Sequence, residues 1–384
     1  MRLLHLIPSA DPRFGGTVAW AVTCCLVLEE LGHRSDLATC DEPPGPALPG
    51  VRTIALGPAH GNYSYARRLV PWLRGNACNY DAALVHGLWQ YPGLAARRAL
   101  ASSGTPYFVV PHGMLDPWFR RAHPIKHVKK AAYWWLAERS VSEAARAVLF
   151  TSQDELHLAR RSFALEGSRL CVSRLGVRDA WGSNGESCPA VGTVYPEQDG
   201  ENYLLHMCRM HPVKGGDLLL QAFAACRAVH PDLHLVMAGP FEGAWGKHLL
   251  RLTVGLGLSE HVHFLGLVSG EAKTALLRGA DALVSPSRED TFPMSVLEAL
   301  ACGVPVLLSE GVRIWREVCD CGAGVAEPCS RNGVQRLLER WAQMDLEGRA
   351  EMAAHARQCF ERMFEVHKAV EGLVSVLREH GVHG

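Results

Sequence analysis

The chain has 384 residues, of which 48% are hydrophobic and 20% are charged. This composition is typical of a folded globular protein, and the length favours two domains over one. The 39 basic and 39 acidic side chains give no formal net charge, which argues against nucleic acid or an acidic polymer as a partner.

The first residues predict a cytoplasmic protein. The apolar segment Leu3–Ile7 is followed at once by Pro8, so it is too short for the apolar core of a signal peptide. No apolar run approaches the roughly 18 residues that a membrane-spanning helix needs. We therefore expect at most peripheral contact, at the inner face of a membrane.

The thirteen cysteines are scattered and include no Cys-x-x-Cys pair, which favours reduced thiols over a disulfide framework. Cys319, Cys321 and Cys329 are the densest group. A zinc site there is the weaker interpretation, because the spacing is unusual and no fourth ligand is evident. Buried free cysteine is favoured, and we expect no metal and no cofactor.

Short apolar runs alternate with amphipathic stretches in the N-terminal half of the chain. This alternation predicts parallel strands joined by crossover helices. The expected strands are Leu3–Ile7, Ala83–His86, Tyr107–Val110 and Ala147–Phe150. The segment 181–202 then breaks the pattern; it is rich in Gly, Pro, Ser and acidic residues, which predicts a linker or a surface excursion.

The same rhythm returns after this interruption. Strands are expected at Tyr203–Cys208, Leu233–Ala238, Val262–Phe264, Ala282–Ser285 and Val304–Leu308. The sequence thus predicts two doubly wound α/β domains, 1–180 and 203–363, and a final helix in 364–384 that packs back on the first domain. Such folds bind ligands outside the carboxyl ends of their strands, here in a crevice facing both domains.

Two cations and two glycines follow the first strand of the second half. Arg209 and Lys214-Gly215-Gly216 stand between Tyr203–Cys208 and an amphipathic helix that begins near Asp217. A guanidinium and an ammonium beside a glycine-containing turn suit a diphosphate. The alternative, a solvated basic loop, does not explain why both cations fall at the strand exit.

A carboxylate-bearing loop follows the strand Ala282–Ser285. Asp290 and Glu298 could accept hydrogen bonds from ribose and sugar hydroxyls, because ionised carboxylates are acceptors only. Ser295 and Glu298 also have the spacing of a capping box, in which the glutamate serves only its own helix. Spacing alone leaves these two interpretations of Glu298 open.

Two further features mark the N-terminal half. His112 follows the strand Tyr107–Val110 on a glycine-containing loop and could donate to a phosphate or sugar oxygen, although a lone histidine is more often structural. Gly15-Gly16 precede the helical pattern Thr17–Leu31. They could leave N–H groups for an anion or form a plain tight turn.

Several common nucleotide motifs are missing from the sequence. The first strand is not followed by Gly-x-Gly-x-x-Gly, and the pair Gly246-Lys247 lacks the rest of a P-loop, which argues against dinucleotide reductases and P-loop NTPases. No Asp-x-Asp occurs. Protein cations would then have to do the work of a metal on a nucleoside diphosphate.

Together these segments resemble the family-4 retaining glycosyltransferases, which have the GT-B fold. The segment PSREDTFPMSVLEALACGVPV is similar to the family signature, with Asp290 and Glu298 eight residues apart. CRMHPVKGGDLLLQAF is similar to its Arg…Lys-Gly segment. RLGVRD, VMAGP, HVHFLGLVS, GADALVSPS and GGTVAWAVTCCLVLEELGH match other pieces in order, so the resemblance covers most of the chain.

The resemblance implies two Rossmann-like domains facing each other across a cleft and a metal-independent transferase with a nucleotide-diphosphate sugar as co-substrate. Arg209 and Lys214 would bind the diphosphate and neutralise the leaving group. The other implied roles are Glu298 on the ribose, Asp290 with Phe292, Pro293 and Met294 on the donor sugar, Leu267 or Val268 near the base, and His112 and Gly16 from the opposite domain.

Two departures fall in the sugar-binding loop. Asp290 stands where glutamate is commoner in the family, and Pro293 stands where many members have glycine, which removes one N–H donor.

The acceptor is expected to be a lipid-linked or growing surface saccharide. PHGMLDPW resembles a subgroup associated with exopolysaccharide assembly. The segment 118–135 mixes basic and aromatic residues, as helices at an anionic membrane surface do, or as a helix with a solvated basic face does. A nucleotide-sugar epimerase or phosphorylase of the same fold, or a catalytically silent nucleotide-sugar-binding protein, remain as alternatives.

Overall fold

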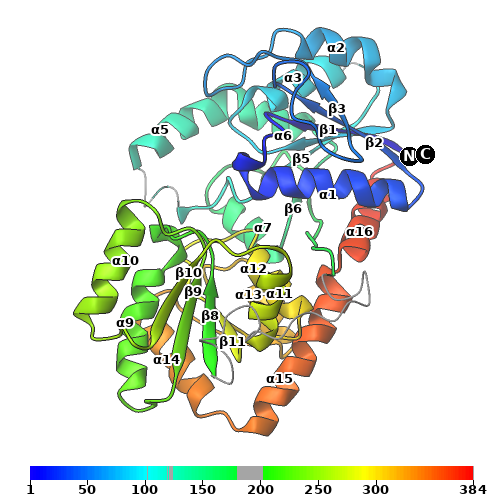
Figure 1. Cartoon of the computed structure of the whole chain (residues 1–384). Helices are drawn as coiled ribbons and strands as arrows, with labels where there is room; N and C mark the ends of the chain where they lie inside the picture. The colour runs from blue at the N-terminus through cyan, green and yellow to red at the C-terminus, as the bar shows by residue number, and fades with distance from the viewer. Residues whose placement is uncertain (102, 119, 121–123, 180–201, 384) are drawn as a thin grey trace. The chain divides into compact units, whose positions relative to one another are not determined.

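The computed structural model describes residues 1–101, 103–118, 120, 124–179 and 202–383. It divides the chain into two compact units (Figure 1): unit 1 is Met1–Leu175 with Val366–Gly384, and unit 2 is Gly176–Glu365. Each unit has one parallel sheet with helices, as the doubly wound prediction requires. All but one residue of the expected linker at 181–202 lie outside the described residues.

Unit 1 has a seven-stranded sheet in the order β3-β2-β1-β4-β5-β6-β7. All of its pairings are parallel. Its strands β4 and β5 are buried along their whole length, as expected when helices cover both faces. The strands are β1 (Arg2–Ile7), β2 (Arg34–Thr39), β3 (Arg52–Ala55), β4 (Ala82–His86), β5 (Tyr107–Val110), β6 (Ala147–Phe150) and β7 (Leu170–Val172).

The crossovers of unit 1 are mostly α-helical. They comprise η1 (Pro12–Phe14), α1 (Gly16–Glu30), α2 (Leu69–Asn76), η2 (Ala77–Asn79), α3 (Tyr91–Leu100), α5 (Pro124–Tyr133), the π-helical η3 (Trp134–Glu138), α6 (Arg139–Ala144) and α7 (Gln153–Arg160). The last helix, α16 (Val366–Glu379), packs against α1, where His367 lies 2.8 Å from Glu30. Its apolar stripe, which includes Leu373 and Leu377, is buried.

Unit 2 has a six-stranded parallel sheet in the order β10-β9-β8-β11-β12-β13. Its strands are β8 (Tyr203–Met207), β9 (His234–Ala238), β10 (Val262–Gly266), β11 (Ala282–Ser285), β12 (Val306–Ser309) and β13 (Gly324–Glu327). Its helices are η5 (Pro212–Lys214), α9 (Gly216–Arg227), α10 (Ala244–Gly255), α11 (Gly270–Gly279), α12 (Met294–Ala301), α13 (Trp315–Asp320), α14 (Arg331–Ala342), α15 (Leu346–Cys359) and the π-helical η6 (Phe360–Phe364).

The unit boundaries lie a few residues from the expected ones. Gly176–Asp179 belong to unit 2, where Val177 donates to the Phe364 carbonyl and Asp179 forms a two-pronged ion pair with Arg357 on α15. The described helices include none that is both long and apolar enough to span a bilayer.

All nine predicted strands are present, and the last of them is shifted, because β12 begins at Val306 and not at Val304. Four strands were not predicted. β2 carries Arg, Ser and Asp in its first half, β3 begins with Arg and Thr, β13 ends with Glu, and β7 has only three residues. Short or polar strands of this kind lack the apolar run on which the prediction relied.

Candidate functional site

The β8–α9 loop carries the two predicted cations at the carboxyl end of the unit 2 sheet. Its centre is the short helix η5, whose C-cap residue is Gly215 with φ of +72°. A Cβ atom at Gly215 would lie 2.1 Å from the Pro286 carbonyl oxygen. Glycine is therefore needed twice, for the left-handed backbone and for the close approach of the β8 and β11 loops.

Lys214 and Asp290 meet across these two loops. Lys214 Nζ lies 2.6 Å from Asp290 Oδ2, and the two side chains are only 18% and 12% exposed. β8 and β11 are neighbours in the sheet, so their carboxyl ends bring the cation and the carboxylate together. Lys214 and Asp290 were both predicted to belong to one site, and in the structure they are in direct contact.

Arg288 ties the same two loops together and was not predicted. Its guanidinium makes two hydrogen bonds to Asp217 at the start of α9, of 2.9 and 2.7 Å, and its N–H donates to the Val213 carbonyl. The hydrogen bond to Asp217 raises the pKa of Arg288. Nothing in the sequence distinguished Arg288 from its charged neighbours, because its partner lies 71 residues away.

Arg209 is the first charged residue after β8, and its side chain is exposed. Within the residues that the structure describes, it forms no ion pair, unlike Lys214. Arg209 can therefore bind an anion without first releasing a protein carboxylate, whereas Lys214 must exchange or share its partner Asp290.

The structure decides against the capping box at Glu298. Helix α12 begins at Met294 with Pro293 as N-cap, and no side chain caps it. Ser295 therefore lies inside the first turn and cannot act as the N-cap. Glu298 Oε1 instead accepts a hydrogen bond of 2.8 Å from Lys273 on α11, a lysine that was not predicted.

The remaining predicted residues of unit 2 differ in exposure. Leu267, just after β10, is 78% exposed, whereas Val268 packs partly against the hydrophobic core. Phe292 and Met294 also pack against this core, and Pro293 is buried. The Met294 N–H donates to the Phe292 carbonyl, so this N–H is engaged within the loop.

His112 lies in unit 1, directly beyond β5, with a positive φ of 51°. Its loop is held by the buried carboxylate of Glu155, which accepts from the Gly113 N–H at 2.6 Å and from Thr151. Burial raises the pKa of Glu155, and these hydrogen bonds oppose that rise. The loop is thus fixed by a buried group and is not a mobile surface turn.

His112 is also part of a row of three histidines. His112 Nε2 lies 3.0 Å from His86 Nδ1, and His86 Nε2 lies 3.0 Å from His5 Nδ1. Burial lowers the pKa of His5 and of His112 to about 4 and lowers that of His86 as well, so all three rings are neutral at pH 7. His5 and His86 were not predicted, although His5 lies within one predicted strand and His86 ends another.

Gly15 and Gly16 form the start of α1. Gly15 is the N-cap residue with φ of 80°, no side chain caps the helix, and a Cβ there would meet nothing within 4 Å. Among the described residues, the N–H groups of Gly16 and Thr17 have no hydrogen-bond partner. This end of α1 is therefore a turn that needs glycine and also leaves N–H groups open, which agrees with both earlier interpretations.

No group of three or more His, Cys, Asp or Glu side chains in the described residues could hold a metal ion. The thiols considered for zinc have other neighbours: Cys321 lies against Met363 Sδ, and Cys329 lies against the Pro286 carbonyl. Burial raises the pKa of Cys319 to about 11. These cysteines are described as free thiols.

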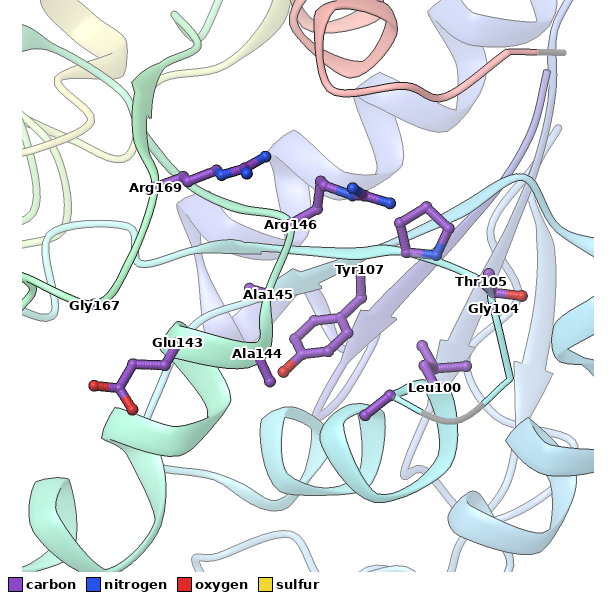
Figure 2. A pocket seen from close by; sticks show the side chains of 12 residues that line it. Leu100, Gly104, Thr105, Tyr107, Glu143, Ala144, Ala145, Arg146, Gly167 and Arg169 are labelled. Atoms are coloured by element: carbon purple, nitrogen blue, oxygen red, sulfur yellow. The ribbon is translucent and has the colours of Figure 1, made fainter.

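A hollow of about 400 Å³ opens beside the amino ends of the unit 1 strands, whereas His112 follows the carboxyl end of β5. Figure 2 shows it beside Tyr107, with the side chains of Arg146 and Arg169 above and Glu143 pointing away from both. Glu143 pairs with Arg139 on its own helix. The hollow lies at the amino ends of β5 and β6 and contains none of the predicted residues.

Comparison with known families assigns both halves of the chain. A model described as glycosyl transferases group 1 matches residues 193–358, and one described as glycosyl transferase 4-like domain matches residues 15–176. The D-inositol 3-phosphate glycosyltransferase of Mycolicibacterium gilvum is 31% identical over 333 residues, which cover 79% of this chain and 72% of the relative.

Other similarities are shorter or more distant. The protein of the same name from Salinispora tropica is 32% identical over 183 residues, so the match covers 44% of this chain and only 37% of the relative. Among solved structures, Anabaena HepE in complex with UDP aligns with a TM-score of 0.78 and 18% identity, covering 99% of this chain and 100% of that one. At this identity the likeness shows the GT-B fold alone.

Proposed function

Because the chain belongs to the family-4 glycosyltransferases, we propose that it is a retaining, metal-independent enzyme that transfers a sugar from a nucleotide-diphosphate donor to a hydroxyl acceptor. The observation that carries this proposal is the contact of Lys214 with Asp290 beside the exposed Arg209. At the carboxyl ends of β8 and β11, this arrangement brings together two cations suited to a diphosphate and a carboxylate suited to a sugar.

The proposed chemistry is electrostatic. Negative charge grows on the diphosphate as the bond to the sugar breaks, and Arg209 and Lys214 stabilise it in place of a metal ion. As the diphosphate binds, Lys214 turns part of its hydrogen bonding from Asp290 to phosphate oxygens. The Asp290 carboxylate then gains capacity to accept hydrogen bonds from sugar hydroxyls.

Glu298 is proposed to accept hydrogen bonds from the ribose hydroxyls. Lys273 binds only one of its two oxygens in the described residues, which leaves acceptor capacity on the carboxylate. In this proposal Lys273 on α11 is a positioning residue, because its hydrogen bond fixes the orientation of the Glu298 carboxylate on α12. The exposed Leu267 offers an apolar contact for the base, and the loop 292–294 lies next to Asp290 in sequence.

For His112 and Gly16, which belong to unit 1, the proposed contacts to sugar and phosphate come from the family resemblance alone. The open N–H groups at the start of α1 suit a phosphate oxygen. Substitution tests these assignments without any assumption about how the two units are arranged.

The acceptor is proposed to be a lipid-linked or growing surface saccharide, met at the inner face of a membrane, with a role in polysaccharide assembly. The segment 124–135 supports this: Ile125, Val128 and Trp135 are 77%, 68% and 64% exposed, and Lys126 and Lys129 beside them are exposed too. Exposed apolar side chains among lysines suit an anionic bilayer surface. Residues 119 and 121–123 of the same segment lie outside the described residues.

The first experiment screens hydrolysis of UDP-, GDP- and ADP-sugars, beginning with UDP-glucose because the HepE structures include a complex with it. We expect one nucleotide class to turn over, with the anomeric configuration of the donor kept in the product. Arg209→Ala and Lys214→Ala should each lower kcat/KM at least about 100-fold, the size of one lost transition-state donor.

Lys247→Ala is the matched control, because Lys247 is an exposed cation on α10 of the same unit. Its turnover should equal that of the wild type. If Arg209→Ala and Lys214→Ala also leave nucleotide binding and turnover unchanged, the proposed donor site is wrong. Nucleotide binding without turnover of any donor would favour the catalytically silent alternative, and inversion at C2–C4 of the free donor would favour an epimerase.

A further inference from the structure

Three imidazole rings run as a row across neighbouring strands of unit 1. His5 is on β1, His86 ends β4 and His112 follows β5, and the sheet order places these strands side by side. The register explains the row, because His5 pairs with Leu84 and His86 pairs with Val110. Each histidine thus stands two residues further along its strand, and neighbouring rings stack with centroids 5.2 and 5.3 Å apart.

The two N···N contacts of 3.0 Å restrict where the protons can be. Each contact needs one proton between its two nitrogens, and a neutral imidazole carries one proton in total. If His86 donates from Nδ1 to His112, then His112 carries its proton on Nδ1 and His5 donates from its own Nδ1. If His86 donates from Nε2 to His5, then His112 is protonated on Nε2. Only these two arrangements satisfy both contacts.

The burial of His5 makes the two proton arrangements differ in stability. His5 is completely buried, and within the described part of the chain its Nε2 has no hydrogen-bond partner. In the first arrangement this nitrogen is a bare acceptor. In the second it is an N–H donor without a partner, and buried orphan N–H groups are rare in proteins because they are costly. The first arrangement is therefore the more stable one.

We propose that His86 and His5 are positioning residues that hold His112 as its Nδ1–H tautomer, so that His112 presents a hydrogen-bond donor to an oxygen of the nucleotide-sugar donor. This inference rests on the proposed function, which assigns His112 to that ligand. His112 is only half-buried, and its Nδ1 has no partner among the described residues. Glu155, through Gly113, fixes the loop that carries it.

The consequence concerns which ligand atoms His112 can bind. A ring held as Nδ1–H donates to a phosphate oxygen or to a sugar oxygen, and it cannot accept a hydroxyl proton at that nitrogen. Moving the proton off Nδ1 would shift both bridging protons together and leave the buried orphan N–H at His5. The histidine row thus opposes a change of tautomer.

The test reads the tautomer directly. We would label the histidines of the full chain with ¹⁵N and record two-bond ¹H–¹⁵N correlations at pH 7 without ligand, assigning the His112 signal by its loss in His112→Asn. Protonated Nδ1 with bare Nε2 is the expected result. A protonated Nε2 would overturn the inference, and this outcome needs no variant of His86 or His5.

Variants then test whether the row is responsible. His86→Leu should leave His112 as a mixture of tautomers and lower the kcat of donor hydrolysis about tenfold with little change in KM, as loss of a contact made in the transition state does. His5→Phe should act in the same direction, and it replaces His86→Leu if that variant does not fold. An unchanged His112 tautomer in a folded variant would contradict the assigned role.

Tyr107→Phe is the matched control. It removes the buried hydrogen bond that the Tyr107 hydroxyl donates to the Val141 carbonyl. Tyr107 lies on β5, the strand that precedes His112, and does not touch the histidine row. The tautomer of His112 and the turnover should therefore both stay as in the wild type. Failure of this inference is distinct from failure of the proposed function. A wrong tautomer with normal effects of Arg209→Ala and Lys214→Ala refutes the inference alone, whereas no effect of those two variants refutes the donor site.

Discussion

Substitution of Gly215 by alanine tests how closely the two loops of unit 2 must approach. The added Cβ would lie 2.1 Å from the Pro286 carbonyl oxygen, so the β8 or β11 loop must move by about 1 Å or more to restore an ordinary contact. The φ of +72° adds a cost of about 1–2 kcal/mol for a residue with a side chain.

The displacement should matter more for activity than for stability. Lys214 precedes Gly215 directly, and Asp290 lies in the other loop, so a shift of about 1 Å changes their geometry and should lower kcat/KM about 100-fold. Urea unfolding should show a loss of about 1–3 kcal/mol, of which the positive φ accounts for about 1–2 kcal/mol.

Gly257→Ala separates the two effects. Gly257 has a φ of +69° in the same unit, but a Cβ there would meet nothing within 4 Å. It should lose a similar 1–2 kcal/mol of stability and keep wild-type kcat/KM. If Gly215→Ala matches Gly257→Ala in both stability and kcat/KM, the close contact of the loops has no functional role and the reasoning is wrong.

Three further predictions concern pairing, pH and the membrane. Lys273→Met should weaken binding of the nucleoside diphosphate several-fold in calorimetry and leave kcat of bound donor nearly unchanged, while unaltered affinity would contradict a role in placing Glu298. Burial raises the pKa of Glu138 to about 7, so the folded state holds a proton that the unfolded state loses above about pH 4.5, and this group's contribution to stability falls as pH rises to about 7. Between pH 5 and 7, Glu138→Gln should therefore gain about 1.4 kcal/mol per pH unit relative to the wild type in urea unfolding, and parallel curves would refute the shift. Val128→Glu should reduce sedimentation with phosphatidylglycerol vesicles, whereas Val254→Glu, an equally exposed site on α10, should not; equal sedimentation of both variants would count against the membrane surface.

The fold could be predicted because uninterrupted apolar runs identify buried parallel strands. The strands Leu3–Ile7 and Ala282–Ser285 are such runs, and each lies between a charged residue and a proline. Short strands such as β7 carry no such signal, and their place depends on neighbours far along the chain. The alternation of strand and helix was therefore enough for the architecture and insufficient for the edges of the sheets.

The site was only partly predictable, for a related reason. Lys214 and Asp290 could be proposed because each follows a recognisable strand. Their direct contact, and the hold of Arg288 on Asp217, depend on which strands are neighbours. Glu298 shows the limit most clearly. Its spacing from Ser295 agreed with a local cap, but α12 begins two residues earlier than that cap requires, with Pro293 as N-cap, and the partner of Glu298 is Lys273.

The return of the chain to unit 1 has a consequence for synthesis and for protein engineering. Unit 1 is complete only when its last helix, α16, has left the ribosome. During translation, the face of α1 that α16 covers therefore stays exposed until all of unit 2 has been synthesised. The chain passes between the units after Leu175 and again after Glu365. These two segments lie side by side, because Val177 pairs with Glu365. A separately expressed unit 1 should therefore join residues 366–383 behind Leu175, and a chain cut at 365 should expose apolar surface and aggregate.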